Sequence, residues 1–267
     1  MRRFPEVSVR RITRAAGRPA ARPGSHTLLT ADGVRIDAVH RPGRDLTWVF
    51  VLCHGFTGSS GSADMARVTG ALRSHGGVIA FDFRGHGRSR GRSTVGDLEV
   101  LDLQAAVEWA RALGYRNVAT VGFSMGASVA VRHGALLDGA DAVVSVSGPG
   151  WWFERSTRPM KLVHWLVETS AGRVVAEVVF GTRVLPDGWV PVPASPIEVA
   201  RKIAPVPLLV VHGDADKYFP AAHAEALYAA SGEPRQLWME PGFGHAEASA
   251  GVELIGRIGR WVTGEAA

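Results

Sequence analysis

One serine lies between two glycines in Gly122-Phe123-Ser124-Met125-Gly126, and its surroundings suit covalent chemistry. An apolar run over residues 118–122 comes before Ser124 and an alanine- and valine-rich stretch comes after it. The serine is therefore expected at an abrupt turn from a strand into a helix. Side chains two positions away would clash in such a turn, and the glycines remove that clash. The pattern predicts a strained turn that exposes a nucleophilic hydroxyl; a tight turn that holds an inert serine is the alternative.

A serine hydroxyl becomes reactive only when a base takes its proton and a third group orients that base. Ten histidines in the chain could supply the base. Two aspartates, Asp214 and Asp216, follow the apolar run over residues 207–212, and either could supply the acid. The residue types therefore predict acyl transfer by a serine, a histidine and an aspartate. They leave the identity of the histidine and of the aspartate open.

Strand and helix patterns alternate along most of the chain. Apolar runs of strand length cover residues 48–53, 78–83, 118–122, 142–146, 207–212 and 236–240. Helix patterns cover residues 125–137, 195–203, 220–230 and 248–262, and a further helix is expected between Asp97 as N-cap and Gly114. Such alternation specifies a mostly parallel sheet with helices on both faces, in which ligands bind at the carboxyl ends of the strands.

Two segments stand outside this alternation. Residues 26–30 and 34–40 flank Asp32-Gly33, a pair that favours a hairpin with positive φ at both central positions. Residues 150–194 hold four of the eight tryptophans and an amphipathic stretch over residues 160–169. We expect this second segment to be a small helical lid inserted into a core of residues 25–149 and 195–267. Its tryptophans would cover an apolar substrate, form the lid's own core, or do both.

Four segments of the chain resemble the α/β-hydrolase superfamily, and the resemblance spans residues 26–262. They are, in chain order, His54-Gly55-Phe56-Thr57-Gly58, Asp82-Phe83-Arg84-Gly85-His86-Gly87-Arg88-Ser89, the turn at Ser124, and the acid and histidine segments. The order nucleophile, acid, histidine is that of the family. The resemblance implies an α/β fold with a mostly parallel, doubly wound α/β-hydrolase sheet, an N-terminal hairpin and a small helical lid.

The resemblance also assigns the catalytic roles. It implies a triad of Ser124, Asp216 and His245, in which His245 belongs to the loop after the last predicted strand. Asp214 would then hydrogen-bond its own loop or face solvent.

The remaining assignments concern the loops around the triad. Backbone N–H groups of Phe56 and Met125 would form an oxyanion hole for the negative charge that develops on the substrate's carbonyl oxygen. His54 and His212 each precede a glycine at a strand end, and by resemblance their roles are structural. The same holds for the loop over residues 82–89, which would tie neighbouring loops together.

The positive net charge lies in the first residues of the chain. The net charge is +5, but residues 1–24 hold seven arginines and one acid, which amounts to +6 and leaves −1 for the rest. We expect residues 1–24 to be a disordered basic tail. No nucleic-acid partner is expected, because a nucleic-acid-binding protein carries a basic stripe on its folded surface. No stable membrane insertion is expected either, since no apolar run is long enough to span a bilayer.

The chain gives no sign of metal or cofactor chemistry. No His-x-x-x-His or Cys-x-x-Cys spacing occurs, and a serine triad needs neither metal nor cofactor, so none is expected. The single cysteine, Cys53, cannot form an internal disulfide, which fits a cytoplasmic protein. The expected partner is a small-molecule ester, and the sequence does not determine the oligomeric state.

The expected function is hydrolysis of carboxylic esters that carry an apolar acyl or alcohol group, through an acyl-serine intermediate. The same triad serves thioesterases and acyltransferases, which are alternatives on the same fold. A catalytically inactive protein that binds small molecules is a third alternative. Such proteins often lose a triad residue, whereas this chain has all three.

Overall fold

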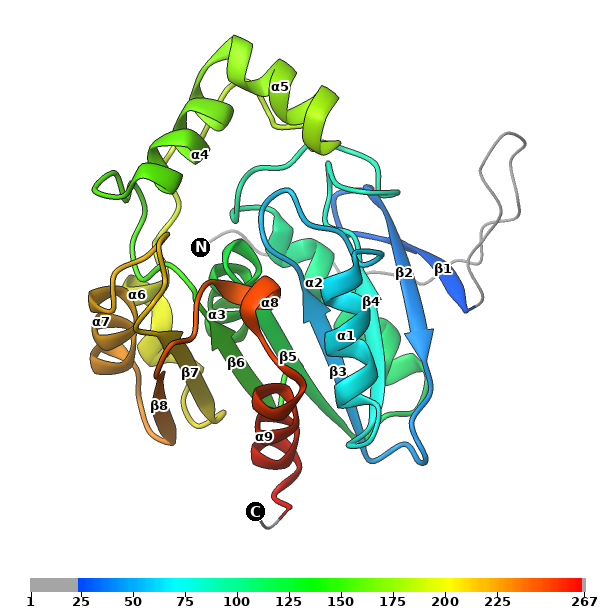
Figure 1. Cartoon of the computed structure of the whole chain (residues 1–267). Coiled ribbons are helices and arrows are strands. Elements are labelled where there is room, and N and C mark those ends of the chain that lie inside the picture. The colour runs from blue at the N-terminus through cyan, green and yellow to red at the C-terminus, as the bar shows by residue number, and fades with distance from the viewer. Residues whose placement is uncertain (1–23, 266–267) are drawn as a thin grey trace.

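The apolar runs of the sequence form neighbouring strands of one sheet (Figure 1). The structure, a computed structural model, describes residues 24–265, so the tail predicted for residues 1–24 lies outside the described residues apart from Gly24. The strands are β1 (Ser25–Leu29), β2 (Arg35–Arg41), β3 (Trp48–Cys53), β4 (Gly77–Phe81), β5 (Asn117–Phe123), β6 (Ala142–Val146), β7 (Leu208–Gly213) and β8 (Arg235–Glu240). Their spatial order is β1-β2-β4-β3-β5-β6-β7-β8. β2 is antiparallel to β1 and to β4, and the other neighbours are parallel, which confirms the predicted fold class.

The central strands are buried on both faces and end along one edge. Every residue of β4, β6 and β7 is buried, which explains why their sequences are nearly continuous apolar runs. The register places Cys53 at the end of β3 beside Gly122 of β5, and Val146 at the end of β6 beside Val211 of β7. The loops that follow these four strands therefore meet at the same edge of the sheet.

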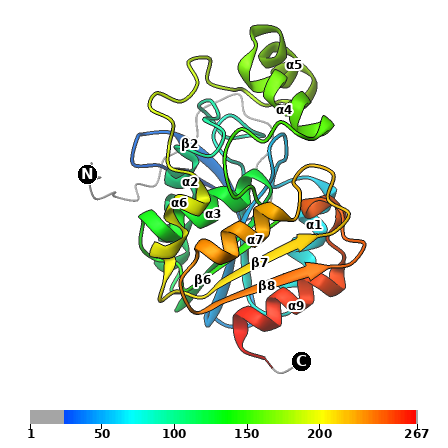
Figure 2. The ribbon, with the colours of Figure 1, turned by 90° about the vertical axis from the view of Figure 1, so that its left-hand side faces the viewer.

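Helices cover both faces of the sheet (Figures 1 and 2). One face carries α1 (Ala63–Leu72), α8 (Ala246–Ser249) and α9 (Val252–Thr263), and the other carries α2 (Glu99–Ala112), α3 (Met125–Leu136), α6 (Pro196–Val199), a 3-10 helix (Ala200–Ile203) and α7 (Ala222–Ala230). Each buried aliphatic side chain, such as Ile255 or Ile258 of α9, contributes about 1.5–3 kcal/mol to the stability of these layers. Within residues 24–265, no helix combines the length and the apolar character that crossing a membrane requires.

Two further helices, α4 (Arg158–Glu168) and α5 (Ser170–Phe180), stand above the edge where the central strands end (Figure 1). Thr157 caps α4 by accepting the Met160 N–H at 3.4 Å, and Thr169 caps α5 by accepting the Gly172 N–H at 2.9 Å. A Cβ at Gly172 would lie well under 3.0 Å from the backbone of α4, so this glycine allows the two helices to pack closely. The segment over residues 150–194 thus holds two helices, where the sequence pattern indicated one.

The turn between β1 and β2 differs from the prediction. Only Gly33 has a positive φ, of 83°, and Asp32 does not. The Gly33 N–H donates to the carbonyl oxygen of Thr30 at 2.9 Å, and the Thr30 N–H donates to that of Val34 at 3.0 Å. The loop is therefore a three-residue connection with glycine in the left-handed position. It takes this form because the carboxylate of Asp32 is held by the Thr30 hydroxyl and by Arg84.

Several helix boundaries also differ from the sequence patterns. α2 begins after Leu98, because Asp97 accepts a hydrogen bond from Arg132 at 3.2 Å instead of capping the helix. The helix predicted over residues 248–262 is divided into α8 and α9 by the extended backbone of Ala250 and Gly251. No pattern indicated α1 or α5.

We expect the buried histidine of α3, His133, to make the fold sensitive to acid. Its ring is 0% exposed and contacts Gln104 of α2 through Nε2 at 2.7 Å, and burial lowers the pKa of His133 to about 4. Stability should be full above about pH 6.5 and should fall by roughly 3 kcal/mol by about pH 4 from this residue alone, since only the unfolded chain binds the proton there. Urea unfolding across this range should show a shallower decline for His133→Gln than for the wild type. An equal decline of the free energy of unfolding in the two proteins would contradict a role of His133 in this sensitivity to acid.

Candidate active site

The turn at Ser124 is strained, and two glycines make it possible. β5 ends and α3 begins on either side of Ser124, which takes φ 53° and ψ −118°. A Cβ at Gly122 would lie well under 3.0 Å from the backbone of Gly126, and a Cβ at Gly126 would lie equally close to the carbonyl oxygen of Cys53. The turn places the Ser124 hydroxyl at the N-terminus of α3, where the helix dipole favours negative charge.

Ser124 is connected to a histidine and an aspartate by hydrogen bonds. His245 Nε2 lies 3.0 Å from Ser124 Oγ, and on the other side of the ring Nδ1 lies 2.8 Å from Oδ2 of Asp216. Because a carboxylate only accepts, Nδ1 carries the hydrogen, and Nε2 of the neutral ring can accept a proton from Ser124. The three side chains come from the loops after β5, β7 and β8. The structure therefore brings together the three residues that the sequence singled out.

Asp216, and not Asp214, reaches the histidine. The side chain of Asp216 is 0% exposed, and its Oδ1 also accepts the backbone N–H groups of Tyr218 and Phe219 at 2.8 and 3.2 Å. Burial acts to raise the pKa of Asp216, but the histidine and these N–H groups outweigh burial and hold the pKa below its usual value. Asp214 is exposed, and its Oδ1 accepts the N–H of Gly242 at 2.6 Å.

Two further residues hold the histidine in place. The ring of Tyr218 stacks on that of His245, with centroids 4.1 Å apart and an angle of 21° between the planes. Directly after His245, the N–H of Ala246 donates to Oγ of Ser147 at 3.0 Å, and the N–H of Ser147 donates to the carbonyl oxygen of Val211 at 2.9 Å. No sequence pattern pointed to Tyr218 or Ser147, because they act only through segments that are distant in the chain.

The loop after β3 passes beside Ser124 with a fixed orientation. A Cβ at Gly55 would lie 3.3 Å from the Cβ of Ser124. The carbonyl oxygen of Gly55 accepts hydrogen bonds from Nδ1 of the buried His54 at 2.7 Å and from the N–H of Gly58 at 3.0 Å. The N–H of Phe56 belongs to the same planar peptide unit and points the opposite way. His54 therefore orients the N–H of Phe56 through the backbone.

The loop over residues 82–89 connects neighbouring loops by buried hydrogen bonds. Asp82 Oδ1 accepts the N–H of Ser60 at 2.7 Å. The buried guanidinium of Arg84 contacts Asp102 through Nη2 at 2.7 Å and Asp32 through Nη1 at 2.7 Å. Asp82 and Arg84 therefore bond to other parts of the protein, which is the structural role expected for this loop.

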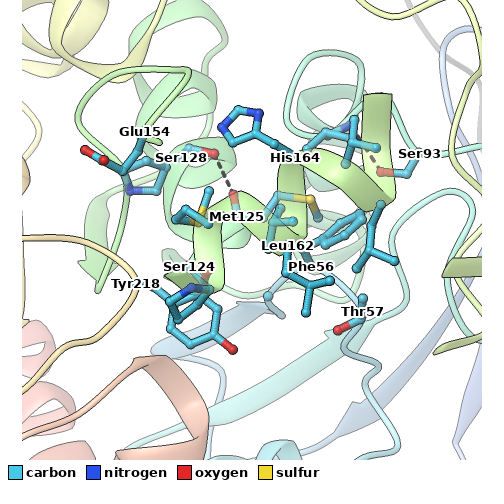
Figure 3. Close-up of a pocket in the computed structure, with 18 of the residues that line it drawn as sticks. Phe56, Thr57, Ser93, Ser124, Met125, Ser128, Glu154, Leu162, His164 and Tyr218 are labelled. Carbon is cyan, nitrogen blue, oxygen red and sulfur yellow. Dashed lines mark hydrogen bonds between the residues drawn. The ribbon is translucent and has the colours of Figure 1, made fainter. Parts of the chain in front are cut away.

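A cavity of about 970 Å³ lies over Ser124 and beneath α4 and α5. Ser124, Phe56, Met125 and Tyr218 all line it (Figure 3). Most of its wall is apolar, and the apolar residues from the segment over residues 150–194 include Trp152, Phe153, Leu162, Leu166, Phe180 and Trp189. Among residues 24–265, no group of three or more His, Cys, Asp or Glu side chains is placed to hold a metal ion.

A buried hydrogen bond between a histidine and a glutamate connects the base of this segment to α7. Oε2 of Glu154 lies 2.9 Å from Nε2 of His223, whose Nδ1 accepts the N–H of Gly150 at 3.0 Å. The ring of Trp151 stacks on that of His223, with centroids 3.7 Å apart. Burial acts to raise the pKa of Glu154, but hydrogen bonds from Ser156 and His223 lower it to about 2. No sequence pattern identified this pair, whose members are 69 residues apart.

Comparisons with known proteins identify the family and the fold of the chain. A model of the alpha/beta hydrolase family matches residues 50–252. An uncharacterised protein of Mycobacterium tuberculosis is 30% identical over 247 residues, which are 88% of this chain and 77% of the relative. The human serine hydrolase BPHL is 27% identical over 177 residues, which are 57% of either chain. Among solved structures, an esterase of Pyrococcus furiosus has the same fold, with a TM-score of 0.71 and 23% identity over 93% of this chain and 95% of that one.

The glycine before the strained turn should not tolerate a methyl group. Gly122→Ala would place a Cβ against the backbone of Gly126, so it should destabilise the protein by about 1–3 kcal/mol or more. Gly70→Ala is the matched control, because Gly70 is exposed within α1 and has open space around it. That change should stabilise by about 0.5–1 kcal/mol. Thermal unfolding of both variants checks the difference, and equal stabilities would contradict it.

Proposed function

This chain belongs to the alpha/beta hydrolase family, and we propose that it is a serine hydrolase that cleaves carboxylic esters through an acyl-enzyme intermediate. The observation that carries the proposal is the continuous set of hydrogen bonds from Ser124 through both ring nitrogens of His245 to Asp216. This arrangement supplies the nucleophile, a base within reach of its proton, and a group that orients the base.

In the proposed first step, Ser124 Oγ bonds to the carbonyl carbon of the ester while its proton moves to His245 Nε2. The carbonyl oxygen becomes an anion, and the N–H groups of Phe56 and Met125 would each stabilise it by about 3–4 kcal/mol. Asp216 is ionised at neutral pH despite its burial, because its hydrogen bonds outweigh burial and hold its pKa below the usual value, so it stabilises the imidazolium that forms.

In the following steps the proton on His245 returns to the reacting groups. The tetrahedral intermediate collapses, the bond to the alcohol oxygen breaks, and that oxygen takes the proton from Nε2. Water then attacks the acyl carbon and gives a proton to the same nitrogen. A second collapse releases the carboxylic acid and returns the proton to Ser124 Oγ.

The cavity supports a substrate with an apolar acyl or alcohol group. Leu162, Phe180 and Val192 line the cavity and are also 54%, 45% and 52% exposed, so its rim is apolar as well as its interior. An apolar chain that enters gains about 25 cal/mol for each Å² that it removes from water. We propose that residues 150–194 act as the lid.

Two of the four tryptophans of the lid, Trp152 and Trp189, serve the packing of the lid as well as the cavity wall, whereas Trp165 is exposed and lies outside the lining. The rings of Trp152 and Trp189 lie 4.9 Å apart, and Trp189 Nε1 donates to the carbonyl oxygen of Thr94. Trp152 Nε1 donates to the carbonyl oxygen of Pro193 at 2.8 Å. Both rings also line the cavity, so forming the core of the lid and covering an apolar substrate are compatible roles for these residues.

Thioester hydrolysis and acyl transfer would use the same steps with another leaving group or acceptor, and nothing in the described residues favours them over ester hydrolysis. The set of hydrogen bonds at Ser124 argues against an inactive binding protein.

A fluorophosphonate should modify Ser124 of the wild type and leave folded Ser124→Ala unmodified, with mass spectrometry as the measurement. Asp216→Asn should slow the labelling on the order of 10³–10⁴-fold, because the ring loses its orienting acceptor. Asp214→Asn is the matched control and should change the rate little, since Asp214 is exposed and an asparagine oxygen can still accept the N–H of Gly242. No adduct on folded wild type would overturn the proposed function. A severe effect of Asp214→Asn alone would overturn the choice of acid.

Long acyl chains should be preferred over acetate in a series of p-nitrophenyl esters. The ratio kcat/KM should rise by up to about fourfold for each added methylene until the cavity is filled. Leu162→Glu should weaken this dependence because Leu162 lines the cavity. Val174→Glu is the control, since Val174 is 62% exposed on α5 and lies outside the lining. A preference for acetate would contradict the apolar substrate.

A further inference from the structure

We propose that Glu247 is a positioning residue, which fixes the backbone of the oxyanion loop, residues 54–58, through a hydrogen bond to Gly55. This inference rests on the proposed function. Glu247 lies in α8, two residues after His245, and its carboxylate is not part of the proposed triad.

The carboxylate of Glu247 contacts the loop at a residue that lies beside the nucleophile. Oε1 accepts the N–H of Gly55 at 3.0 Å. A Cβ at Gly55 would lie 3.3 Å both from this oxygen and from the Cβ of Ser124, so both side chains border the space beside the Gly55 Cα. A charge-assisted bond of this kind is about twice as strong as a neutral one.

Glu247 removes the remaining freedom of a glycine. On the far side of Gly55, His54 and Gly58 already hold its carbonyl oxygen. Glycine has no side chain that limits rotation of the peptide before it, and the bond from Glu247 holds that peptide. The two peptide units that meet at Gly55 are then both fixed, and with them the direction of the Phe56 N–H.

The same loop contains backbone strain that its surroundings must maintain. Thr57 has φ 65°, which is unusual for a β-branched residue and costs about 1–3 kcal/mol. The bond between the Gly58 N–H and the Gly55 carbonyl oxygen closes a turn over this residue. A strained turn keeps its shape only when its ends are held, and Glu247 holds the first of its residues.

Arg67 of α1 keeps Glu247 in place. Its Nη2 donates to the carbonyl oxygen of Glu247 at 2.6 Å, and its Nε donates to that of Ala250 at 3.1 Å. Asp64 holds the guanidinium from the other side at 2.8 Å. Because α1 follows the oxyanion loop and α8 follows His245, these contacts connect the loop that carries the donor to the loop that carries the base.

Two conservative variants separate reach from charge. Glu247→Asp keeps the charge and shortens the side chain by one methylene, whereas Glu247→Gln keeps the reach and an acceptor oxygen. Glu253→Ala is the control, because Glu253 is an exposed glutamate at the start of α9. The measurements are kcat and KM on a p-nitrophenyl ester and the affinity for a trifluoromethyl ketone, whose adduct with Ser124 carries an oxyanion.

We expect Glu247→Asp to lower kcat by about 10–100-fold with little change in KM. An oxyanion-hole donor contributes about 10²–10³-fold to kcat, and a displaced Phe56 N–H would lose part of that contribution. The affinity for the ketone should fall by a similar factor. Glu247→Gln should keep most of the wild-type kcat and most of the affinity for the ketone. Glu253→Ala should match the wild type in both measurements. Amide exchange at Gly55 should be faster in Glu247→Asp than in Glu247→Gln.

Three results would overturn the positioning role. These are an unchanged kcat in Glu247→Asp, an equal loss in Glu247→Gln, or a raised KM at constant kcat, which would mark a substrate contact instead. Each of these results can be observed only if the wild type is active, so none of them contradicts the proposed function. A wild type that neither labels with fluorophosphonate nor hydrolyses any ester overturns both proposals.

Discussion

At Ser124 a buried strand turns into a helix within a single residue, and the close packing of those two backbones is the constraint on which the rest of the site depends. The backbone of Gly126 lies so near to β3 and to Gly122 that neither glycine has room for a Cβ. The serine takes a conformation that is costly for a residue with a side chain, and the packed sheet beneath it maintains that conformation. The position of the hydroxyl is thereby set by the core of the protein and not by a mobile loop.

The other functional groups reach that hydroxyl because the central strands are parallel. Their carboxyl ends lie along one edge, so loops that are far apart in the chain bring Asp216, His245 and the oxyanion loop to the same place. The buried polar groups that orient the nucleophile, the base and the oxyanion loop have specific partners, since an unpaired one would cost free energy. Asp216 accepts three hydrogen bonds, and His54 donates its Nδ1 hydrogen to the carbonyl oxygen of Gly55. The precision of the site comes from these bonds.

The segment above the strands is attached to the same loops. Thr157, the cap of α4, donates its hydroxyl to the carbonyl oxygen of Tyr218, whose ring stacks on His245. At its base, Glu154 is held by His223 of α7. The helices that enclose the cavity are thus connected to the residues that orient the histidine. An apolar enclosure also strengthens the electrostatic interactions within it, because water is excluded.

The sequence by itself determined the sheet, the hairpin and the serine turn, because these depend on local patterns: apolar runs, turn residues and glycine spacing. It also placed Ser124, His245 and two candidate acids in order along the chain. The residue types left the acid open and the resemblance favoured Asp216; the tertiary structure decided that Asp216 meets the histidine while the exposed Asp214 bonds to Gly242, since both follow the same strand and differ in the direction of a loop. Tyr218, Ser147, Glu247 and the pair of Glu154 with His223 were likewise beyond the sequence. Their contacts join segments that lie far apart in the chain, and only the packing of the sheet and its loops brings such segments together.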